Sequence, residues 1–268
     1  MANKHDIMWL DSVDSTNDEA ARRISDIDNL SVLSARDQFR GRGQRGNSWS
    51  SAPGENLTFS IILKYAMSEL DAINSGYLPP LQTYDQFAVS EVAALSVTDF
   101  LAECGISAKI KWPNDIYVDG RKICGILIEN SIRGKNLTHS IVGIGLNVNQ
   151  CNFDASLPNP TSMQLYLKGS SGKYHQSFDM NKCLETIMEI FKGYVQLYMN
   201  GKGGLGRLRR MYLSQLWRKD ERSGFTDCRT GMDFYGTIRG VSDTGYLIVE
   251  NEKGELKEFA FKEISYIL

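Results

Sequence analysis

Long apolar runs, an excess of either charge and a leader-like start are all missing from this sequence. Apolar stretches such as residues 61–63 fall far short of the roughly 18 residues that a membrane span needs. Lys and Arg number 30 against 32 Asp and Glu, a net charge of −2 that disfavours a general polyanion binder. Residues 1–6 have no apolar stretch behind their lysine, so no secretory signal is expected. We therefore expect a cytoplasmic protein with no membrane partner.

Cysteine and histidine are also scarce and scattered. The five cysteines form no close pair, and neither they nor the three histidines have metal-ligand spacing, so a disulfide framework or a Cys/His metal site is not expected. Cys104, Cys124 and Cys183 lie inside apolar patterns and are expected to be small buried hydrophobic residues.

The apolar periodicity predicts an α+β protein with a mixed, mostly antiparallel sheet packed on helices. Helices are expected after the Ser15 cap, from residue 89 to Gly105, over 179–199, and in a short stretch ending near 217. The predicted strands cover residues 7–11, 30–36, 57–65, 108–112, 123–129 and 140–148. Turn signals at 242–245 and 251–254 then indicate a small β module. We expect a large domain over 1–217 and a small β domain over 218–268.

The segment 40–49 reads Arg-Gly-Arg-Gly-Gln-Arg-Gly-Asn-Ser-Trp, with three arginines, three glycines and no acid. Glycines let backbone N–H groups approach an anion and arginines add charged donors, which favours a phosphate or carboxylate site. A flexible solvated loop is the alternative. The G-x-G-x-x-G match is not followed by a helix, and Asn47 stands where a P-loop needs lysine, so neither nucleotide motif applies.

Two further segments carry candidate ligands. In Lys-Trp-Pro-Asn-Asp, residues 111–115, the proline ends a strand and presents Asn114 and Asp115 as oxygen ligands suited to Mg²⁺. The alternative is a hairpin with solvated charges. The run 141–149 contains strand-interior glycines, which make room for a close neighbour, and Asn147, which could hydrogen-bond a ligand.

In this order the three segments, together with Lys122 and Gly125, resemble the biotin-protein ligase family. The resemblance implies a class II aminoacyl-tRNA synthetase-like catalytic domain and a C-terminal SH3-like β-barrel. It also implies activation of biotin by Mg·ATP to biotinyl-5′-AMP with release of pyrophosphate. Biotin would then pass to a lysine of a carboxylase biotin carrier domain. No tightly bound prosthetic group is implied, and a homodimer is left open.

Site residues are implied by the same resemblance, position by position. Catalytic roles fall to Arg42, Lys122 and Asp115, with Asp115 steering or deprotonating the acceptor lysine. Biotin-binding positions are Ser15, Thr16, Asn17, Gln38, Gly41, Arg42, Gly43, Lys122 and Gly125. ATP- or adenylate-binding positions are Arg40, Arg45, Asn47, Trp49, Lys111, Asn114 and Asn147. Asn114 and Asp115 would hold Mg²⁺. Ser15 and Thr16 also fit a helix cap, and the two roles are compatible.

Three alternatives accompany this interpretation. Some family members carry an N-terminal DNA-binding domain, but only six residues precede the first predicted strand here, so no nucleic-acid partner is expected. A lipoate-protein ligase-like enzyme and a biotin-binding regulator without transfer activity are the others.

The sequence departs from the family pattern at two positions. Gln44 and Asn47 stand where better-known members carry arginine, which predicts a less tightly retained adenylate.

Overall fold

A seven-stranded mixed sheet forms the centre of the molecule in the computed structural model, which describes residues 7–172 and 176–267, apart from the side chains of residues 45 and 171. The strand order is β1-β2-β3-β7-β6-β5-β4, with β1 and β2 parallel and every other neighbouring pair antiparallel. The strands are β1 (Ile7–Val13), β2 (Val32–Gln38), β3 (Leu57–Lys64), β4 (Lys109–Lys111), β5 (Asp115–Val118), β6 (Arg121–Arg133) and β7 (Asn136–Leu146). The predicted mixed, mostly antiparallel sheet is confirmed.

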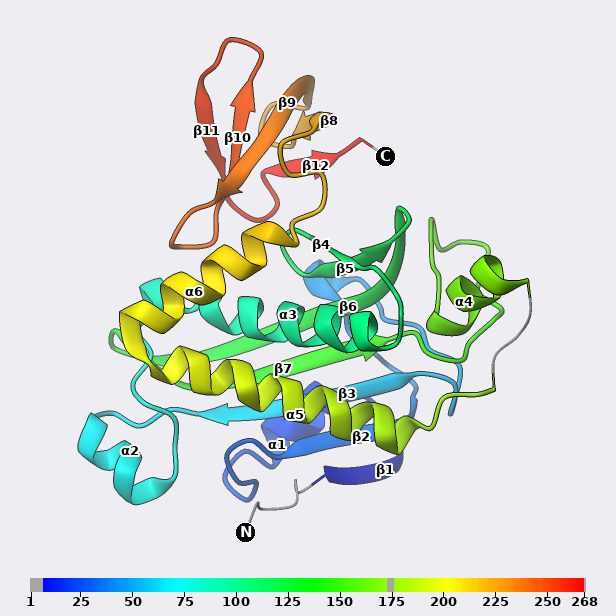
Figure 1. Ribbon diagram of the computed structural model, residues 1–268. Coiled ribbons are helices and arrows are strands. Elements are labelled where there is room, and N and C mark those ends of the chain that lie inside the picture. The colour runs from blue at the N-terminus through cyan, green and yellow to red at the C-terminus, as the bar shows by residue number, and fades with distance from the viewer. Residues whose placement is uncertain (1–6, 173–175, 268) are drawn as a thin grey trace.

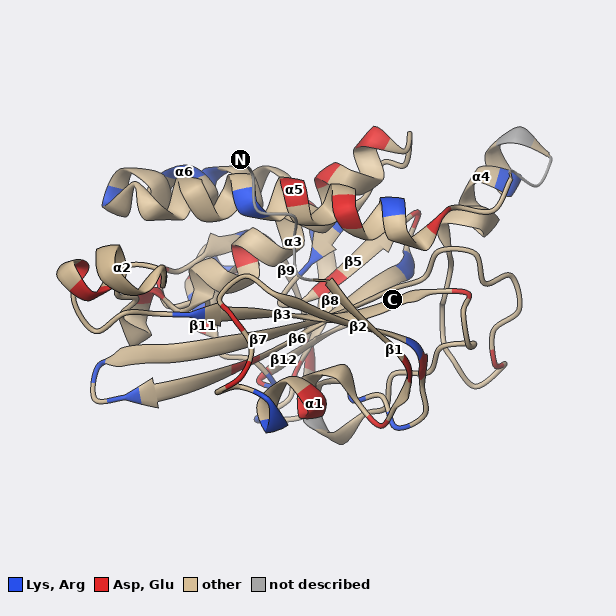
Figure 2. Ribbon diagram, turned by 90° about the horizontal axis from the view of Figure 1, so that it is seen from below, with Lys and Arg blue, Asp and Glu red and all other residues tan. Residues whose placement is uncertain are grey.

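Helices cover both faces of this sheet unequally (Figure 2). Three long helices, α3, α5 and α6, lie on one face, and α1 lies on the other. The helices are α1 (Thr16–Arg22), α2 (Glu69–Ser75), α3 (Phe87–Glu103), α4 (Met163–Ser171), α5 (Met180–Met199) and α6 (Gly201–Ser214). Gly105 adopts a left-handed conformation, φ 76°, just past the end of α3, as the sequence predicts. Helices α2 and α4 are not predicted by the apolar pattern.

One transverse row of the sheet provides the floor of the site described below. Successive Cα partners across five strands are Ala35, Thr58, Gly145, Gly125 and Asp115. Residues paired across strands project to the same face of a sheet, here the face that α1 covers. Two adjacent glycines in this row leave a gap in the side-chain layer.

The chain ends in a second, five-stranded antiparallel sheet, which stands beyond α6 in Figure 1. Its strands, in the order β11-β10-β9-β8-β12, are β8 (Arg222–Asp227), β9 (Met232–Val241), β10 (Leu247–Asn251), β11 (Leu256–Phe259) and β12 (Ile264–Tyr266). The predicted small β module is therefore present, and its closure into an SH3-like barrel stays a prediction. Phe225 and Phe259 belong to the same buried cluster as Phe59, so one core runs through both sheets.

A buried ion pair joins α3, α6 and the second sheet. Glu91 is 1% exposed and accepts a hydrogen bond from the Arg209 guanidinium. Arg209 also donates to the backbone oxygens of Val241, at 3.2 Å, and Ser242. A buried charge needs such partners, because desolvation otherwise disfavours it.

This pair predicts a pH-dependent stability. Burial raises the pKa of Glu91 from 4.5 to about 7, although Arg209 acts in the opposite direction. The native state then binds more protons than the unfolded chain between those values, so the free energy of unfolding falls as pH rises from about 4.5 to 7 and is level above. The free energy of unfolding of the wild type, measured by urea titration, should fall by about 2–3 kcal/mol across that window relative to that of Glu91→Gln.

The matched control is Glu103→Gln, an exposed carboxylate on the same helix, whose pH profile should follow that of the wild type. Parallel profiles for Glu91→Gln and wild type would contradict the assignment.

Candidate active site

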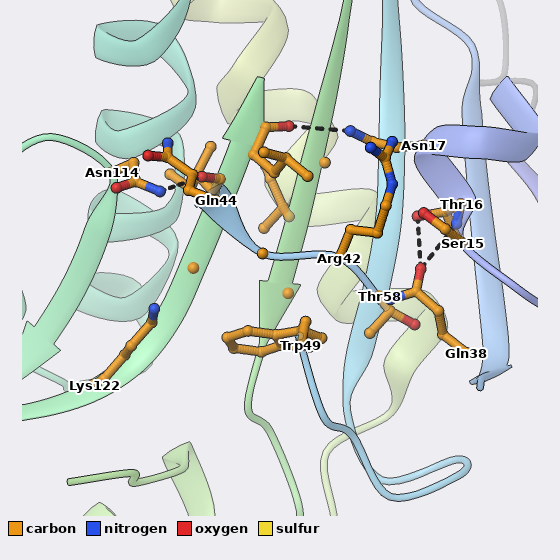
Figure 3. A pocket seen from close by; sticks show the side chains of 17 residues that line it. Ser15, Thr16, Asn17, Gln38, Arg42, Gln44, Trp49, Thr58, Asn114 and Lys122 are labelled. Carbon is orange, nitrogen blue, oxygen red and sulfur yellow. Dashed lines mark hydrogen bonds between the residues drawn. The ribbon is translucent and has the colours of Figure 1, made fainter. Parts of the chain in front are cut away.

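A pocket opens on the α1 face of the central sheet, above the glycine row (Figure 3). It brings together the arginine- and glycine-rich loop 40–49, the β5–β6 hairpin with Asn114 just before it, and the start of α1. Ten of the positions predicted as site residues line it: Ser15, Thr16, Asn17, Gln38, Arg42, Gly43, Trp49, Asn114, Lys122 and Gly125. The expected meeting of segments 40–49 and 111–122 in one cavity is therefore observed.

Polar groups at the start of α1 form one wall of the pocket. Ser15 is the N-cap of the helix, its hydroxyl accepting from the Asp18 N–H at 3.4 Å. The backbone N–H and the hydroxyl of Thr16 both donate to Gln38 Oε1, at 2.8 and 3.2 Å. Ser15 and Thr16 are buried, yet line the cavity, so capping and lining coexist. This wall offers donors and acceptors to a neutral polar ring.

Asn17 is fixed by hydrogen bonds on both sides of its amide. Its Nδ2 donates to Glu129 Oε2 at 2.8 Å, and its Oδ1 accepts from the Ser60 hydroxyl at 2.6 Å. The amide rests against Gly143 of β7, where a Cβ would lie only 2.4 Å from Asn17 Oδ1. This glycine is thus required by a close approach, as the sequence predicts for strand-interior glycines.

Among the described residues that line the pocket, both cations are paired with carboxylates. Arg42 lies 2.7 Å from Glu129 and 2.8 Å from Asp18, and Lys122 Nζ lies 2.7 Å from Asp115 Oδ1. Burial acts to lower the pKa of Arg42, but the hydrogen bond to Glu129 and the charges of Glu129 and Asp18 outweigh it and raise that pKa. The described lining of the pocket is therefore not positive overall, although the loop 40–49 by itself carries three arginines and no acid. An incoming anion must compete with these ion pairs.

Trp49 lies across the glycine row (Figure 3). A Cβ on Gly145 would lie 2.3 Å from Trp49 Cε2, and one on Gly125 would lie 3.0 Å from Trp49 Cζ3. The Lys122 ammonium is 5.7 Å from the centre of the indole. The indole Nε1 is buried and has no hydrogen-bond partner in the described protein. Such an unpaired donor is suited to a ligand acceptor.

The loop carrying Trp49 has a defined backbone, which disfavours the open solvated alternative. Gly43 donates its N–H to Asn47 O at 2.7 Å, and Trp49 donates its N–H to Gly41 O at 2.9 Å. Gly41 is buried against Trp49 O, where a Cβ would lie at 2.4 Å, so a side chain there would obstruct the loop. A single 3-10 turn, Gln44–Gly46, forms the tip.

Several predicted residues do not line the pocket. Arg40 and Asn47 are exposed, and the side chain of Arg45 lies outside the described part. Asn147 is buried and donates to Thr161 O at 2.9 Å, so it holds the segment before α4. Lys111 points toward the second sheet, where its Nζ lies among aromatic rings.

Asp115 and Asn114 occupy neighbouring but different places. Asp115 lies at the edge of the glycine row and reaches the cavity only through Lys122. Asn114 lines the cavity and donates to Ile126 O at 2.5 Å. Among the described residues no group of three His, Cys, Asp or Glu side chains could hold a metal ion. The Mg²⁺ role of Asn114 and Asp115 stays a prediction. No described helix is long and apolar enough to cross a membrane.

Sequence reasoning gave no role in the pocket to four residues: Asp18, which it considered only as part of a helix cap, and Thr58, Ser60 and Glu129. Asp18 and Glu129 pair with Arg42, and Thr58 lies in the pocket floor. The available signal was strand alternation: Thr58 and Ser60 interrupt an otherwise apolar buried strand, which marks a polar neighbour on one face.

Comparison with known proteins agrees with this geometry. The profile of the biotin/lipoate A/B protein ligase family matches residues 9–147, just over half of the chain. Biotin–[acetyl-CoA-carboxylase] ligase of Paracoccus denitrificans is 28% identical over 90% of this chain and 92% of that relative. Biotin–protein ligase 2 of Arabidopsis thaliana is 35% identical over 94% of this chain and 71% of that relative. Biotin protein ligase from Aquifex aeolicus in complex with biotin and ATP has the same fold, with a TM-score of 0.72, 24% identity and 97% of each chain covered. The chain therefore belongs to the biotin/lipoate A/B protein ligase family.

Proposed function

We propose that this protein is an ATP-dependent biotin–protein ligase that forms biotinyl-5′-AMP and transfers biotin to a lysine of a carboxylase carrier domain. One observation carries the proposal. Arg42 from the loop 40–49 and Lys122 from β6 lie in one pocket, on either side of Trp49 (Figure 3). Relatives named as biotin ligases and a related structure holding biotin and ATP support it.

The first step brings two anions together. A carboxylate 4 Å from a phosphate charge costs about 1 kcal/mol in bulk water and about 4 kcal/mol near a protein surface. Arg42 and Lys122 offset this repulsion when the substrates replace Glu129, Asp18 and Asp115 as their partners. The biotin carboxylate then attacks the α-phosphorus, and pyrophosphate leaves with its Mg²⁺.

Each wall of the pocket has a matching role. The wall of Ser15, Thr16 and Gln38 supplies donors and acceptors for the ureido ring of biotin. Trp49 covers the adenine, a flat ring that the indole can stack upon. Asn114, which lines the cavity, would assist the Mg²⁺ that accompanies ATP.

The second step needs a neutral amine, whereas a free lysine has a pKa near 10.4. Asp115 is the candidate group that steers or deprotonates this amine, because its carboxylate lies beside Lys122 at the open end of the β5–β6 hairpin. The acceptor nitrogen attacks the acyl carbon, AMP leaves, and the amine proton passes to a base.

The proposal also covers domain organisation and location. Residues 218–268 would form an SH3-like domain beside the catalytic domain over 1–217, and the enzyme would act in the cytoplasm.

The decisive experiment supplies labelled biotin, ATP and Mg²⁺ to the purified protein, with and without a purified biotin carrier domain. Pyrophosphate release and label on the carrier lysine are the expected results. Release with lipoate but not with biotin would favour a lipoate ligase-like enzyme. Biotin binding without pyrophosphate release would favour a non-catalytic regulator.

Gln44 predicts how firmly the adenylate is held. Its side chain lines the pocket and its Oε1 is buried without a partner, whereas Asn47 is exposed on the same loop. An arginine at 44 adds a charge-assisted donor, so Gln44→Arg should slow adenylate release by about tenfold, equivalent to about 1.4 kcal/mol. Release of labelled biotinyl-AMP in a chase experiment measures it.

Asn47→Arg is the companion variant at the other position where better-known members carry arginine; it adds the same charge outside the pocket lining, so it should slow release less than Gln44→Arg does. Equal off-rates for Gln44→Arg and the wild type would dispose of the idea that Gln44 weakens retention.

A further inference from the structure

Lys111 occupies a box of aromatic rings outside the pocket. Its Nζ lies 4.5 Å from the ring centre of Tyr117, 5.1 Å from that of Tyr266 and 5.7 Å from that of Trp217. The same ammonium donates to the Tyr117 hydroxyl at 2.9 Å. Within the described chain no carboxylate lies in ion-pair range of it. A cation within about 6 Å of an aromatic face is attracted by the ring, and here three rings act together.

The three rings come from parts of the chain that are far apart in sequence. Tyr117 belongs to β5, Trp217 follows α6, and Tyr266 belongs to β12 of the second sheet. The rings also contact one another, with centres 5.3 Å apart for Tyr117 and Trp217 and 5.5 Å apart for Trp217 and Tyr266. Lys111 therefore lies at the junction between the central sheet and the second sheet.

Backbone and side-chain bonds continue this junction. Ile110 N–H donates to Gln215 O, and Trp217 N–H donates to Ile110 O, both at 2.8 Å. One residue beyond Lys111, the Trp112 indole donates to Gly245 O at 3.0 Å. The segment that follows α6 thus holds the β4–β5 hairpin at its base, and the turn between β9 and β10 of the second sheet holds it near its tip.

That hairpin carries groups of the proposed active site. Lys111 is the Cα partner of Asp115, whose carboxylate pairs with Lys122, and Asn114 lies between them in the cavity. A shift of the hairpin away from the second sheet would therefore move Asp115 and Asn114 relative to Lys122 on β6. Small displacements of such groups lower catalytic rates strongly.

We propose that Lys111 is a positioning residue: its ammonium, held by Tyr117, Trp217 and Tyr266, fixes the β4–β5 hairpin against the second sheet and thereby aligns Asn114 and Asp115 with Lys122. This inference rests on the proposed biotin ligase function for its catalytic readout. It replaces the direct nucleotide contact expected for Lys111 from the resemblance.

The test compares Lys111→Met, which keeps the apolar stem and removes the charge, with Lys111→Arg, which keeps a cation that stacks on rings. Lys109→Met is the matched control: Lys109 lies on the same strand, and its exposed ammonium contacts only Gln215 among the hydrogen bonds of the described chain, at 3.2 Å. In the full-length enzyme, kcat for pyrophosphate release should fall at least tenfold in Lys111→Met, with the KM values for biotin and ATP within twofold of wild type. Lys111→Arg should recover most of the rate, and Lys109→Met should match wild type.

Amide hydrogen exchange supplies a readout that does not depend on activity. Amides of residues 112–118 should exchange several-fold faster in Lys111→Met than in wild type, while those of β2 and β3 are unchanged. A raised KM for ATP at unchanged kcat would overturn the inference in favour of direct nucleotide contact. Wild-type exchange and wild-type kcat in Lys111→Met would also overturn it. An inactive wild type would instead count against the proposed function, and exchange would still decide the role of Lys111.

Discussion

Replacing Lys122 with methionine is expected to lower kcat for biotin-dependent pyrophosphate release by about 10²–10³-fold. The ammonium lies inside the pocket, 2.7 Å from Asp115 and 5.7 Å from the Trp49 ring centre, where the proposed mechanism brings the two reacting anions together. Loss of one preorganised donor to a developing charge commonly has an effect of this size. ATP–pyrophosphate exchange at saturating biotin and ATP measures the first step without the carrier.

Two companion variants separate this role from general damage. Arg121→Met removes the neighbouring positive charge, which is exposed on the same strand, and should leave exchange at the wild-type rate. Asp115→Asn should lower biotin transfer to the carrier more than it lowers exchange. Wild-type exchange in Lys122→Met would rule out its role in activation, and wild-type rates for both steps in Asp115→Asn would remove Asp115 from the mechanism.

Gly145→Ala is expected to weaken adenylate binding by ten- to a hundredfold while leaving the fold intact. A Cβ at this position would lie 2.3 Å from Cε2 and 2.5 Å from Nε1 of Trp49. Because Trp49 is carried by a loop, the indole can swing away, but it could then no longer cover the nucleotide as proposed. Calorimetric titration with a non-hydrolysable biotinyl-AMP analogue would measure the loss.

Gly143→Ala should fail differently, because its neighbour cannot move freely. Asn17, 2.4 Å from the added Cβ, is held by Ser60 and Glu129. We expect a loss of about 1–3 kcal/mol in the free energy of unfolding. Gly193→Ala on α5 is the control, because no atom outside its own helix backbone lies within 4 Å of its added Cβ, and helix propensity should make it neutral or stabilising.

The Gly145 prediction has its own contradicting outcome. If Gly145→Ala bound the analogue as tightly as wild type, the proposal that Trp49 covers the nucleotide would be wrong.

The sequence predicted the elements of the fold whose signals are local. Alternating or periodic apolar residues marked the central strands and α5. The Asp-Gly dipeptide at 119–120, which is typical of a tight hairpin turn, joins β5 to β6 with φ values of 48° and 73°. Helix α2 was not predicted, because none of its residues is buried and its sequence therefore lacks the apolar stripe of a packed helix. The extension of β6 to Arg133 escaped because its outer part is only half-buried or exposed and lacks the apolar pattern of a core strand.

For the site, residue type predicted location better than it predicted partners. Arg42, Lys122 and Trp49 were placed in one pocket by the resemblance, and the structure agrees. Glu129, the carboxylate opposite Arg42, could not be found in this way, because it lies 87 residues from Arg42 along the chain. Pairing over that distance depends on the register of the sheet, which a local pattern does not contain.

The transverse row of Thr58, Gly145, Gly125 and Asp115 restricts how the chain can vary in length during evolution. Insertion of one residue before Gly143 in β7 would turn both its glycines to the opposite face and bring the bulky Ile144 toward Trp49. Such an insertion would fill the cavity even though every side chain that contacts substrate were kept. Tolerated insertions and deletions in this hairpin should therefore be confined to its tip, between Arg133 and Asn136, where the two strands turn.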